Sequence, residues 1–284
     1  MRPIRPTIGA VTPNDGDRCD LAAWGDPDVV RRYGTDGVTD PGEAAALSAA
    51  ADAARGDVLD LGVGGGRTTR LLAPAARRYT GLDAAPAMVE LARARNPGVD
   101  LRVGDARDLS RYPDRGHDLV VFSYNGLDAV DHPGRVAALA EMHRVLRPGG
   151  RLVVSSLNID GPSYDERPWT LRRGGGGARA GLRAATVVLA RAARHPHRQV
   201  RALGHYRRVR HLAEDGPGFS RRPLRDHEFR FVVHFASFGA TVAMLRAAGL
   251  DVIDAWSEQG SVLDPSTTGA AADYVHYLCR RGDG

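Results

Sequence analysis

Short apolar runs alternate with segments of helical periodicity along much of this chain of 284 residues. The clearest run, Val58 to Leu61, has the length of a buried strand and is too short for a helix. A cluster of glycines follows it, and after the glycines the apolar residues Leu71, Leu72 and Ala75 recur at helical spacing. The stretch therefore predicts a strand, a tight glycine turn and a helix.

The alternation continues downstream of this stretch. It predicts, in chain order, a strand at 79–83, a helix at 84–95, strands at 100–103 and 117–122, a helix at 135–146 and a strand at 151–157. Prolines and a glycine run at 174–177 then interrupt the pattern up to about residue 228, with one predicted helix at 180–194. The chain closes with an extended segment at 229–235, a helix at 237–248 and strands at 250–256 and 274–280. At the other end, residues 1–20 predict a loose arm and residues 21–54 helical segments, the last at 43–54.

The residues of the glycine turn limit the class of ligand-binding motif to which it can belong. Glycine allows backbone angles that a Cβ would obstruct and lets a ligand approach the main chain closely. The helix that follows directs its free N–H groups at that ligand. Arg67 stands where a dinucleotide fingerprint requires its third glycine, so that motif is not matched. Instead an acid, Asp60, closes the strand, and glycines follow it at Gly62, Gly64 and Gly66.

Three later features add to this picture. Asp83 ends the next predicted strand, where a carboxylate can accept hydrogen bonds from both ribose hydroxyls of an adenosine. The tripeptide Gly104–Ala106 follows the third predicted strand, and a Pro-Gly-Gly turn at 147–150 joins a predicted helix to a predicted strand. Asp83 supports adenosine binding without choosing between cofactors.

In order and spacing, these motifs resemble those of the class I S-adenosylmethionine (SAM) methyltransferases, over about residues 20–158 and again near the C-terminus. The segment Phe122 to Asp128, Phe-Ser-Tyr-Asn-Gly-Leu-Asp, is similar to an element of bacterial small-molecule methyltransferases. The resemblance implies an α/β fold: a Rossmann-like seven-stranded sheet with a terminal antiparallel strand, an N-terminal helical lid and an inserted cap. It divides the chain into arm and lid (1–54), SAM-binding core (55–158), substrate cap (159–228) and C-terminal completion of the sheet (229–284).

The resemblance also implies the cofactor SAM, its product S-adenosylhomocysteine (SAH) and the residues that bind them. Asp83 would accept from the ribose and Asp105 from the adenine amine. Met88 would lie beside the adenine, although it suits the core equally well. Tyr33, with Trp24, would contact the cofactor from the lid or else pack the lid helices against the sheet. The implied set is Tyr33, Asp60, Gly62, Gly64, Gly66, Asp83, Met88, Asp105, Ala106, Tyr124 and Asn125.

The expected reaction is an in-line displacement at the methyl group by an O or N atom of the acceptor. Because the sulfonium is already activated, the protein mainly has to align the acceptor and exclude water, and a general base can assist. The candidate bases, which we expect to face the cleft, are Tyr124, His132, Asn158, His205, His211 and His234, and of these we select His234 as the catalytic residue. The expected substrate contacts are Tyr124, Asn158, Trp169, Arg207 and Arg208. The sequence has no cluster of metal ligands, so we expect no metal.

Positive charge is concentrated in the predicted cap. Between residues 167 and 213 there are twelve arginines and no acid, whereas the rest of the chain carries more acids than arginines. Such a basic face suits an anionic small molecule, an anionic carrier protein or nucleic acid, or it is a solvated face that pairs with acids of the core. Only Trp169 and Tyr206 interleave with these arginines, which makes nucleic acid an unlikely partner.

The sequence therefore predicts a SAM-dependent methyltransferase that modifies an O or N atom of a small molecule in natural-product metabolism. Two alternatives stay open: an RNA methyltransferase that uses the basic cap, and a non-catalytic SAM-binding protein of the same fold. Cys19 and Cys279 are the two cysteines, which argues against a disulfide scaffold. With no apolar run of about 20 residues and no apolar secretory signal, we expect a cytoplasmic protein without a membrane partner. A homodimer is left open.

Overall fold

The computed structural model describes residues 24–34, 39–169, 196–266 and 271–282. The predicted arm at 1–20, the glycine run at 174–177 and the predicted helix at 180–194 lie outside these residues. Within the described chain, no helix is long and apolar enough to cross a membrane.

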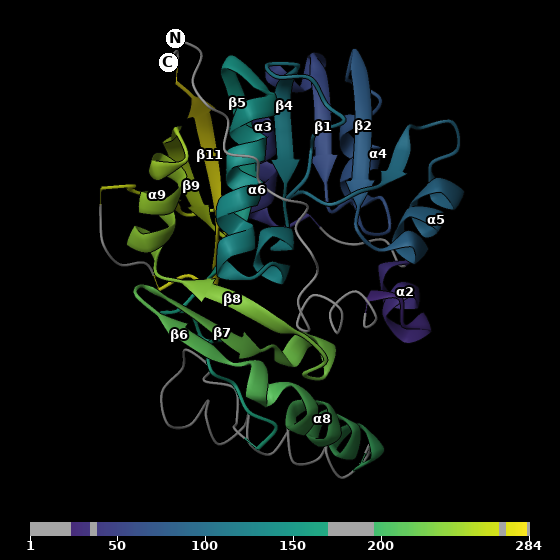
Figure 1. The fold of residues 1–284 in the computed structure, drawn as a ribbon, viewed down its shortest axis with the longest axis vertical. Coiled ribbons are helices and arrows are strands. Elements are labelled where there is room, and N and C mark those ends of the chain that lie inside the picture. Colours follow the sequence, from purple (N-terminus) through teal and green to yellow (C-terminus); the bar gives the residue numbers. More distant parts are fainter. Residues whose placement is uncertain (1–23, 35–38, 170–195, 267–270, 283–284) are drawn as a thin grey trace.

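A central sheet carries the fold, with the strand order β10-β9-β11-β5-β4-β1-β2-β3 (Figure 1). The five strands β1 to β5 pair in parallel, whereas β11 runs antiparallel between β5 and β9. This arrangement confirms the predicted α/β sheet with a terminal antiparallel strand. The strands are β1 Asp57–Leu61, β2 Arg78–Asp83, β3 Leu101–Val103, β4 His117–Phe122, β5 Leu146–Asn158, β9 Leu250–Ser257, β10 Val262–Leu263 and β11 Tyr274–Arg281.

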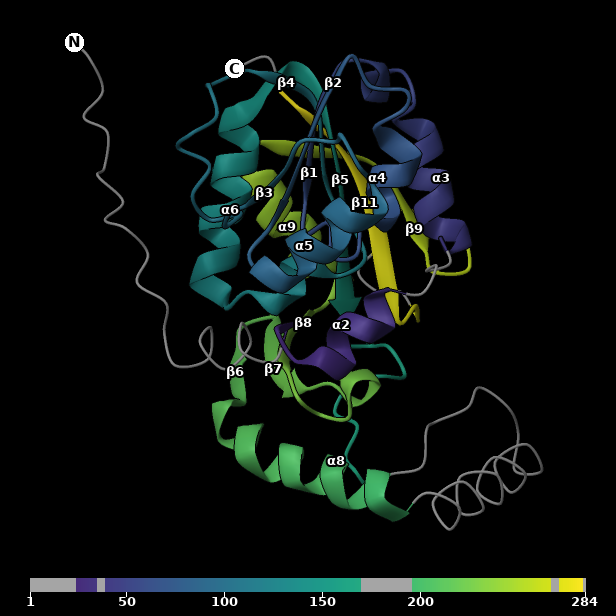
Figure 2. The same ribbon diagram turned by 90° about the vertical axis from the view of Figure 1, so that its right-hand side faces the viewer.

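Helices cover both faces of this sheet. Alternate residues of β1 point to opposite faces, Leu59 and Leu61 toward the helices α6 and α9, and Val58 toward α3, α4 and α5. Because both faces are covered, β1 is buried along its whole length instead of alternating between buried and exposed residues. Figure 2 shows α6 and α3 on opposite sides of the sheet. The helices are α3 Pro41–Ala49, α4 Arg67–Leu72, α5 Pro86–Arg95, α6 His132–Val145 and α9 Phe238–Ala247.

Two of these helices begin earlier than the sequence pattern predicts. The helix α6 starts at His132, before the expected Arg135, because the side chain of Asp131 caps it by accepting from Gly134 N at 2.9 Å. The helix α3 starts at Pro41 for the same reason, with Asp40 as its cap. A proline is the first residue of α3 and the second residue of α6, within the first turn, where its fixed φ favours helix initiation.

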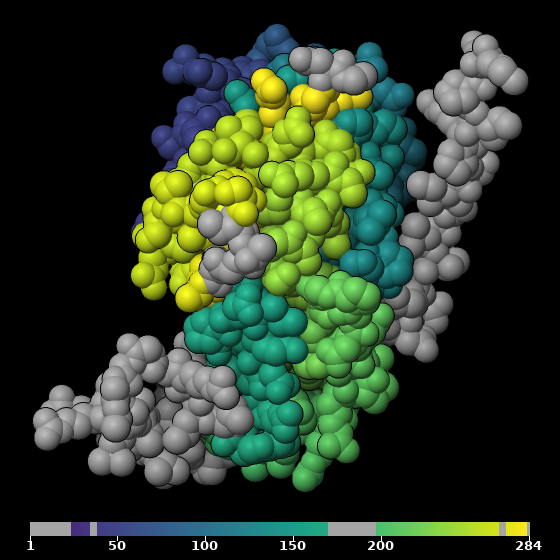
Figure 3. Space-filling model, turned by 90° about the vertical axis from the view of Figure 1, so that its left-hand side faces the viewer, coloured from purple at the N-terminus to yellow at the C-terminus, as the bar shows by residue number. Residues whose placement is uncertain are grey.

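The predicted cap (159–228) forms a small antiparallel sheet together with residues 229–236, and this whole unit, joined to the end of β5, is called the cap below. It consists of β6 Glu214–Gly216, β7 Phe219–Pro223 and β8 Val232–Ala236. The last two residues of β5 pair in parallel with β8, so the cap continues the main sheet. The helix α8, Pro196–Val209, lies on the side of the cap away from the core (Figure 1). In the space-filling view the green cap forms the lower end of the molecule (Figure 3).

The N-terminal helical region separates into two parts. The helix α3 packs on the sheet through the fully buried Ala46 and through the buried Ala50 at its C-terminal cap, and it belongs to the core. The helix α2, Pro27–Tyr33, instead lies between α5 and the cap, where Val29 is buried among cap residues such as Phe231. The four-segment division of the chain stays a prediction, with α2 as the part placed to act as a lid.

A buried ion pair fixes the junction between the core and the cap. Arg135 of α6 and Asp128 are both fully buried and lie 2.5 Å apart. Asp128 also accepts hydrogen bonds from Ser156 Oγ at 2.8 Å and from Leu157 N at 2.7 Å. The carboxylate therefore holds together the turn after β4, the helix α6 and the end of β5, from which the cap extends.

Substituting Asp128 by alanine should destabilise the protein strongly. The change leaves the Arg135 guanidinium buried without its counter-ion, a loss of about 3–5 kcal/mol in unfolding free energy. Urea unfolding followed by circular dichroism measures it. The exposed pair between Arg102 and Asp100 provides the control, since Arg102→Ala should cost less than about 1 kcal/mol. Equal stability of Asp128→Ala and wild type would contradict this account of the junction.

Candidate active site

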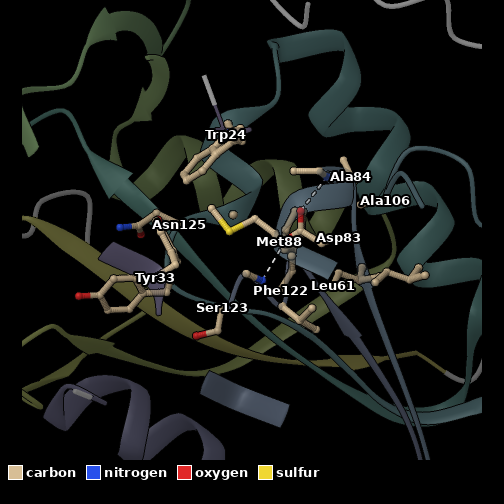
Figure 4. A pocket seen from close by; sticks show the side chains of 18 of the residues that line it. Trp24, Tyr33, Leu61, Asp83, Ala84, Met88, Ala106, Phe122, Ser123 and Asn125 are labelled. Atoms are coloured by element: carbon tan, nitrogen blue, oxygen red, sulfur yellow. Dashed lines mark hydrogen bonds between the residues drawn. The ribbon is translucent and has the colours of Figure 1, made fainter. Parts of the chain in front are cut away.

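A cavity of about 460 Å³ opens at the carboxyl ends of β1, β2 and β4. Its floor is formed by the turns that follow these strands. Its roof is formed by α2, with Tyr33 (Figure 4), and by Asp226 and His227 of the cap turn Arg225–His227. Ligands of open α/β sheets bind at this edge, because the parallel strands direct their following loops to the same side.

The glycine turn forms one wall of the cavity. Gly62 and Gly64 have φ angles of +63° and +52°, which disfavour a side chain. A Cβ on Gly64 would approach the Tyr33 ring to 3.1 Å, and one on Gly62 the Phe122 ring to 2.7 Å. Gly66 also has a positive φ but does not line the cavity. It caps α4 and packs against α5, so its expected contact with the cofactor is replaced by a role in helix packing.

Asp83 links the glycine turn to the end of β2. Its Oδ2 accepts from Gly64 N and its Oδ1 from Ala85 N, each at 2.9 Å (Figure 4). Burial raises the pKa of this carboxyl, and the two N–H donors oppose the shift. Beside it, Met88 of α5 is 1% exposed and contributes to the cavity floor. A ligand in the cavity would thus meet a carboxylate that is already oriented.

Asp60 lies deeper, at the end of β1. Burial raises its pKa to about 6, against the opposing effect of the Tyr79 hydroxyl, which donates to Asp60 Oδ2 at 2.6 Å. Thr68 also lowers the pKa through a hydrogen bond. Asp60 lines the cavity, and its carboxyl is held by the hydrogen bond from Tyr79. It therefore supports the conformation of the glycine turn as well.

The turn after β4 forms the opposite wall. Tyr124 and Asn125 both adopt left-handed backbone conformations, with φ of +54° and +63°, which is strained for residues other than glycine. Asn125 N donates to Ser155 Oγ at 2.6 Å, whereas the buried Asn125 Oδ1 has no hydrogen-bond partner among the described residues. The Tyr124 ring is half exposed, with the Arg67 guanidinium 4.8 Å from its centroid. A buried acceptor in a cavity wall is available to a ligand donor.

An ion pair that the sequence did not indicate lies beside these two turns. Arg67 lines the cavity, and its NH2 donates to Glu43 at 2.7 Å. Glu43 is fully buried and also accepts from the Ser123 hydroxyl. In the sequence, Glu43 is three residues after the capping Asp40, a position that is explained by helix capping alone. No local pattern connects it to Arg67, because the pair forms only when α3 packs on the sheet.

The roof contains a second group of residues that the sequence analysis did not select. Arg32, Asp226 and His227 line the cavity together with Trp24 and Tyr33. The His227 ring lies 5.5 Å from Trp24 and 6.1 Å from Tyr33, measured between ring centroids. Burial lowers its pKa to about 4, so the imidazole is neutral near pH 7.

The structure therefore brings most of the expected cofactor residues together. Asp105 is among them, although Arg107 NH2 donates to its carboxylate at 2.6 Å and so competes with any ligand. Apart from Gly66, each expected residue lines the cavity: Tyr33, Asp60, Gly62, Gly64, Asp83, Met88, Asp105, Ala106, Tyr124 and Asn125. Their individual roles toward a cofactor stay predictions.

The expected substrate residues other than Tyr124 lie outside the cavity. Asn158 is buried and donates to Ala272 O at 3.0 Å, which fixes the end of β5. Trp169 is 61% exposed and packs edge-on against Tyr206 of α8. Arg207 and Arg208 are exposed in the last turn of α8. Because α8 lies on the far side of the cap strands, these arginines cannot contact a molecule within the cavity.

The expectation that His234 faces the cleft also requires correction. This residue lies in the middle of β8, is fully buried and does not line the cavity. Its Nε2 is 3.1 Å from His132 Nδ1, and its ring stacks on Phe219. Burial lowers its pKa to about 2, aided by the nearby cations Arg135 and Arg221 and by His132. Two other candidate bases, His205 and His211, also lie outside the cavity wall.

Comparison with known proteins identifies the central part of the chain. Residues 58–150 match the family described as "Methyltransferase domain". These residues form a class I SAM-dependent methyltransferase domain. The match includes the glycine turn, Asp83 and the turn after β4, so the walls of the cavity belong to the methyltransferase domain while its roof does not.

Three curated relatives match this domain region. A probable S-adenosylmethionine-dependent methyltransferase of Mycolicibacterium smegmatis is 42% identical over 103 residues, 36% of this chain and 38% of the relative. A ubiquinone biosynthesis O-methyltransferase of Xanthomonas oryzae pv. oryzae is 33% identical over 117 residues, 39% and 47% of the two chains. A malonyl-[acyl-carrier protein] O-methyltransferase of Serratia marcescens is 37% identical over 100 residues, 35% and 38%. The chain thus spans less than half the length of each of these relatives.

Solved structures extend the fold beyond the methyltransferase domain. The 1,6-didemethyltoxoflavin-N1-methyltransferase of Burkholderia thailandensis has a TM-score of 0.56 at 16% identity, over 97% of this chain and 92% of that chain. The structure of the DhpI-SAH complex has a TM-score of 0.55 at 21% identity, and the match covers 94% of this chain and 97% of that chain. At these identities the likeness concerns the fold.

The burial of neutral His234 predicts a specific pH dependence of stability. In the unfolded chain a histidine binds a proton below about pH 6.5, whereas folded His234 stays neutral, so the unfolding free energy falls as the pH drops below 6.5. His234→Gln should reduce this slope between pH 6 and 5 by about 1 kcal/mol per pH unit. Urea unfolding at several pH values measures the slope. The exposed His211→Gln is the matched control, and an unchanged slope for His234→Gln would contradict the assignment.

Proposed function

We propose that this protein transfers the methyl group of SAM to an O or N atom of a small acceptor molecule. The observation that carries the proposal is the oriented Asp83 carboxylate beside a left-handed glycine turn, in a cavity whose walls belong to a methyltransferase domain. A carboxylate at the end of the second strand suits the two ribose hydroxyls of an adenosine.

Two further observations support the fit of SAM to these residues. Gly62 and Gly64 line the cavity without a side chain, so a ligand can approach the main chain there. The unpartnered Asn125 Oδ1 can accept a hydrogen bond from a ligand donor. In this proposal Asp83 holds the ribose, Ala106 and Met88 border the adenine, and Tyr33 covers the glycine turn from the lid.

SAM supplies an electrophilic methyl group, and the residues of this chain have to orient the acceptor and receive its proton. His227 replaces His234 as the candidate for the proton, because His227 lines the cavity and is neutral near pH 7. Tyr124 and Asn125, held in a strained turn, are placed to orient the acceptor. The roof of α2 and the cap turn would exclude water from the cavity.

A small-molecule acceptor is supported by the names of two relatives. One is a ubiquinone biosynthesis O-methyltransferase, and the malonyl-[acyl-carrier protein] O-methyltransferase acts, by its name, on a group attached to a carrier protein. Natural-product metabolism, a cytoplasmic location and a homodimer stay predictions for this chain.

Asp83→Asn should weaken SAH binding at least tenfold. The neutral amide loses charge-assisted hydrogen bonds to the ribose, each worth about 1.5–3 kcal/mol, while it keeps one oxygen for the turn. Isothermal titration calorimetry with SAH measures the affinity. Asp100→Asn, an equivalent change at a half-exposed aspartate outside the cavity, should bind like wild type.

The proposal fails if wild type does not bind SAH, or if Asp83→Asn binds it with unchanged affinity. Transfer of a labelled methyl group from SAM to a panel of phenols, amines and carboxylic acids then tests the reaction. A non-catalytic SAM-binding protein would bind SAH and methylate none of them.

A further inference from the structure

The helix α8 presents a basic surface that the active site does not use. Five arginines and no acid occur between residues 196 and 213. One of the five, Arg201, lies near the carboxylates of Asp28 and Glu228. The other four are exposed and have no ion pair with a described residue: Arg198, Arg207, Arg208 and Arg210. Arginines of the core differ, since Arg144 pairs with Glu141 and Arg147 with Asp57. The cationic side chains of α8 therefore remain available to an anionic partner.

Apolar side chains stand among these arginines. Val200 of α8 is 71% exposed, and Trp169, which packs against Tyr206 of the same helix, is 61% exposed. Protein interfaces are enriched in tryptophan, tyrosine and arginine. Stacking on single-stranded nucleic acid would instead require aromatic rings along a basic groove. The α8 surface, defined here as Trp169, Arg198, Val200, Arg201, Arg207 and Arg208, thus has the composition of a protein-docking site.

The α8 surface is connected to the roof of the cavity through ion pairs. Arg201 lies 3.6 Å from Glu228, and Arg32 lies 3.6 Å from the same carboxylate. Arg32 lines the cavity and donates to Asp226 O, which belongs to the cap turn of the roof. Arg201 and Arg32 therefore share one carboxylate between α8 and the roof of the cavity.

We propose that α8 docks an acidic carrier protein that presents its tethered acceptor to the cavity. This inference rests on the proposed methyl transfer and specifies the class of acceptor. The negative surface of the carrier pairs with the arginines, the apolar residues Trp169 and Val200 anchor it, and the phosphate of a phosphopantetheine arm passes Arg201 and Arg32. Arginine suits that phosphate because its planar guanidinium can donate two hydrogen bonds at once.

The test uses the full chain and a fluorescently labelled acidic holo-acyl carrier protein as the probe. Fluorescence anisotropy at low and at moderate salt measures binding. Wild type should bind the carrier, and more weakly as salt rises, since exposed charges are screened. The double variant Arg207→Glu and Arg208→Glu should bind at least about tenfold more weakly. The control variant Arg78→Glu and Arg246→Glu has the same change of net charge, at exposed arginines of β2 and α9, and should bind within twofold of wild type.

SAH affinity separates this inference from the proposed function. Both double variants should bind SAH like wild type, which also verifies that they fold. If SAH binds but the carrier does not, or if the α8 variant binds the carrier as wild type does, the carrier proposal is overturned while methyl transfer stands. Tighter binding to transfer RNA or to phosphatidylglycerol vesicles than to the carrier would likewise overturn it. Failure of wild type to bind SAH would count against the proposed function instead.

Discussion

Two left-handed turns at the ends of parallel strands form opposite walls of the candidate active site. After β1, Gly62 and Gly64 reverse the chain with positive φ, and after β4, Tyr124 and Asn125 do the same with side chains present. Only glycine adopts this conformation without strain, so the first turn brings bare backbone to the cavity. The second turn instead holds polar side chains at its wall against a conformational cost. Helices packed on both faces of the sheet keep the strands, and hence the two turns, at a fixed separation.

The roof of the cavity depends on contacts between segments that are about two hundred residues apart in the sequence. Trp24 stacks on Phe231 of the cap, with ring centroids 4.3 Å apart, and Arg230 of the cap pairs with Asp26 at the start of α2. Arg95 of α5 in turn donates to Tyr33 O at 2.7 Å, so α2 is attached both to the cap and to the core.

The sequence predicts the parts of this site that are set by local chemistry. The glycine turn was found because its backbone conformation requires glycine at positions close together in the sequence. Asp83 was found because it ends a predicted strand. The pair of Glu43 and Arg67 was not found, because it arises only from packing of α3 on the sheet. The choice of His234 was misplaced because strand periodicity gives no sign of which strand the cap covers, and this strand is buried on both sides. The positive charge of residues 196–209 was evident in the sequence, but the position of α8, on the side of the cap away from the core, depends on the topology of the cap (Figure 1).

The central claim is that the cavity between the two left-handed turns is the SAM site. A crystal structure of the protein with SAH tests it most directly. The account predicts the adenosine ribose within hydrogen-bond distance of the Asp83 carboxylate, with the amino-acid part of the ligand along Gly62 and Gly64. Density for SAH at any other place, or a ribose turned away from Asp83, would contradict the account.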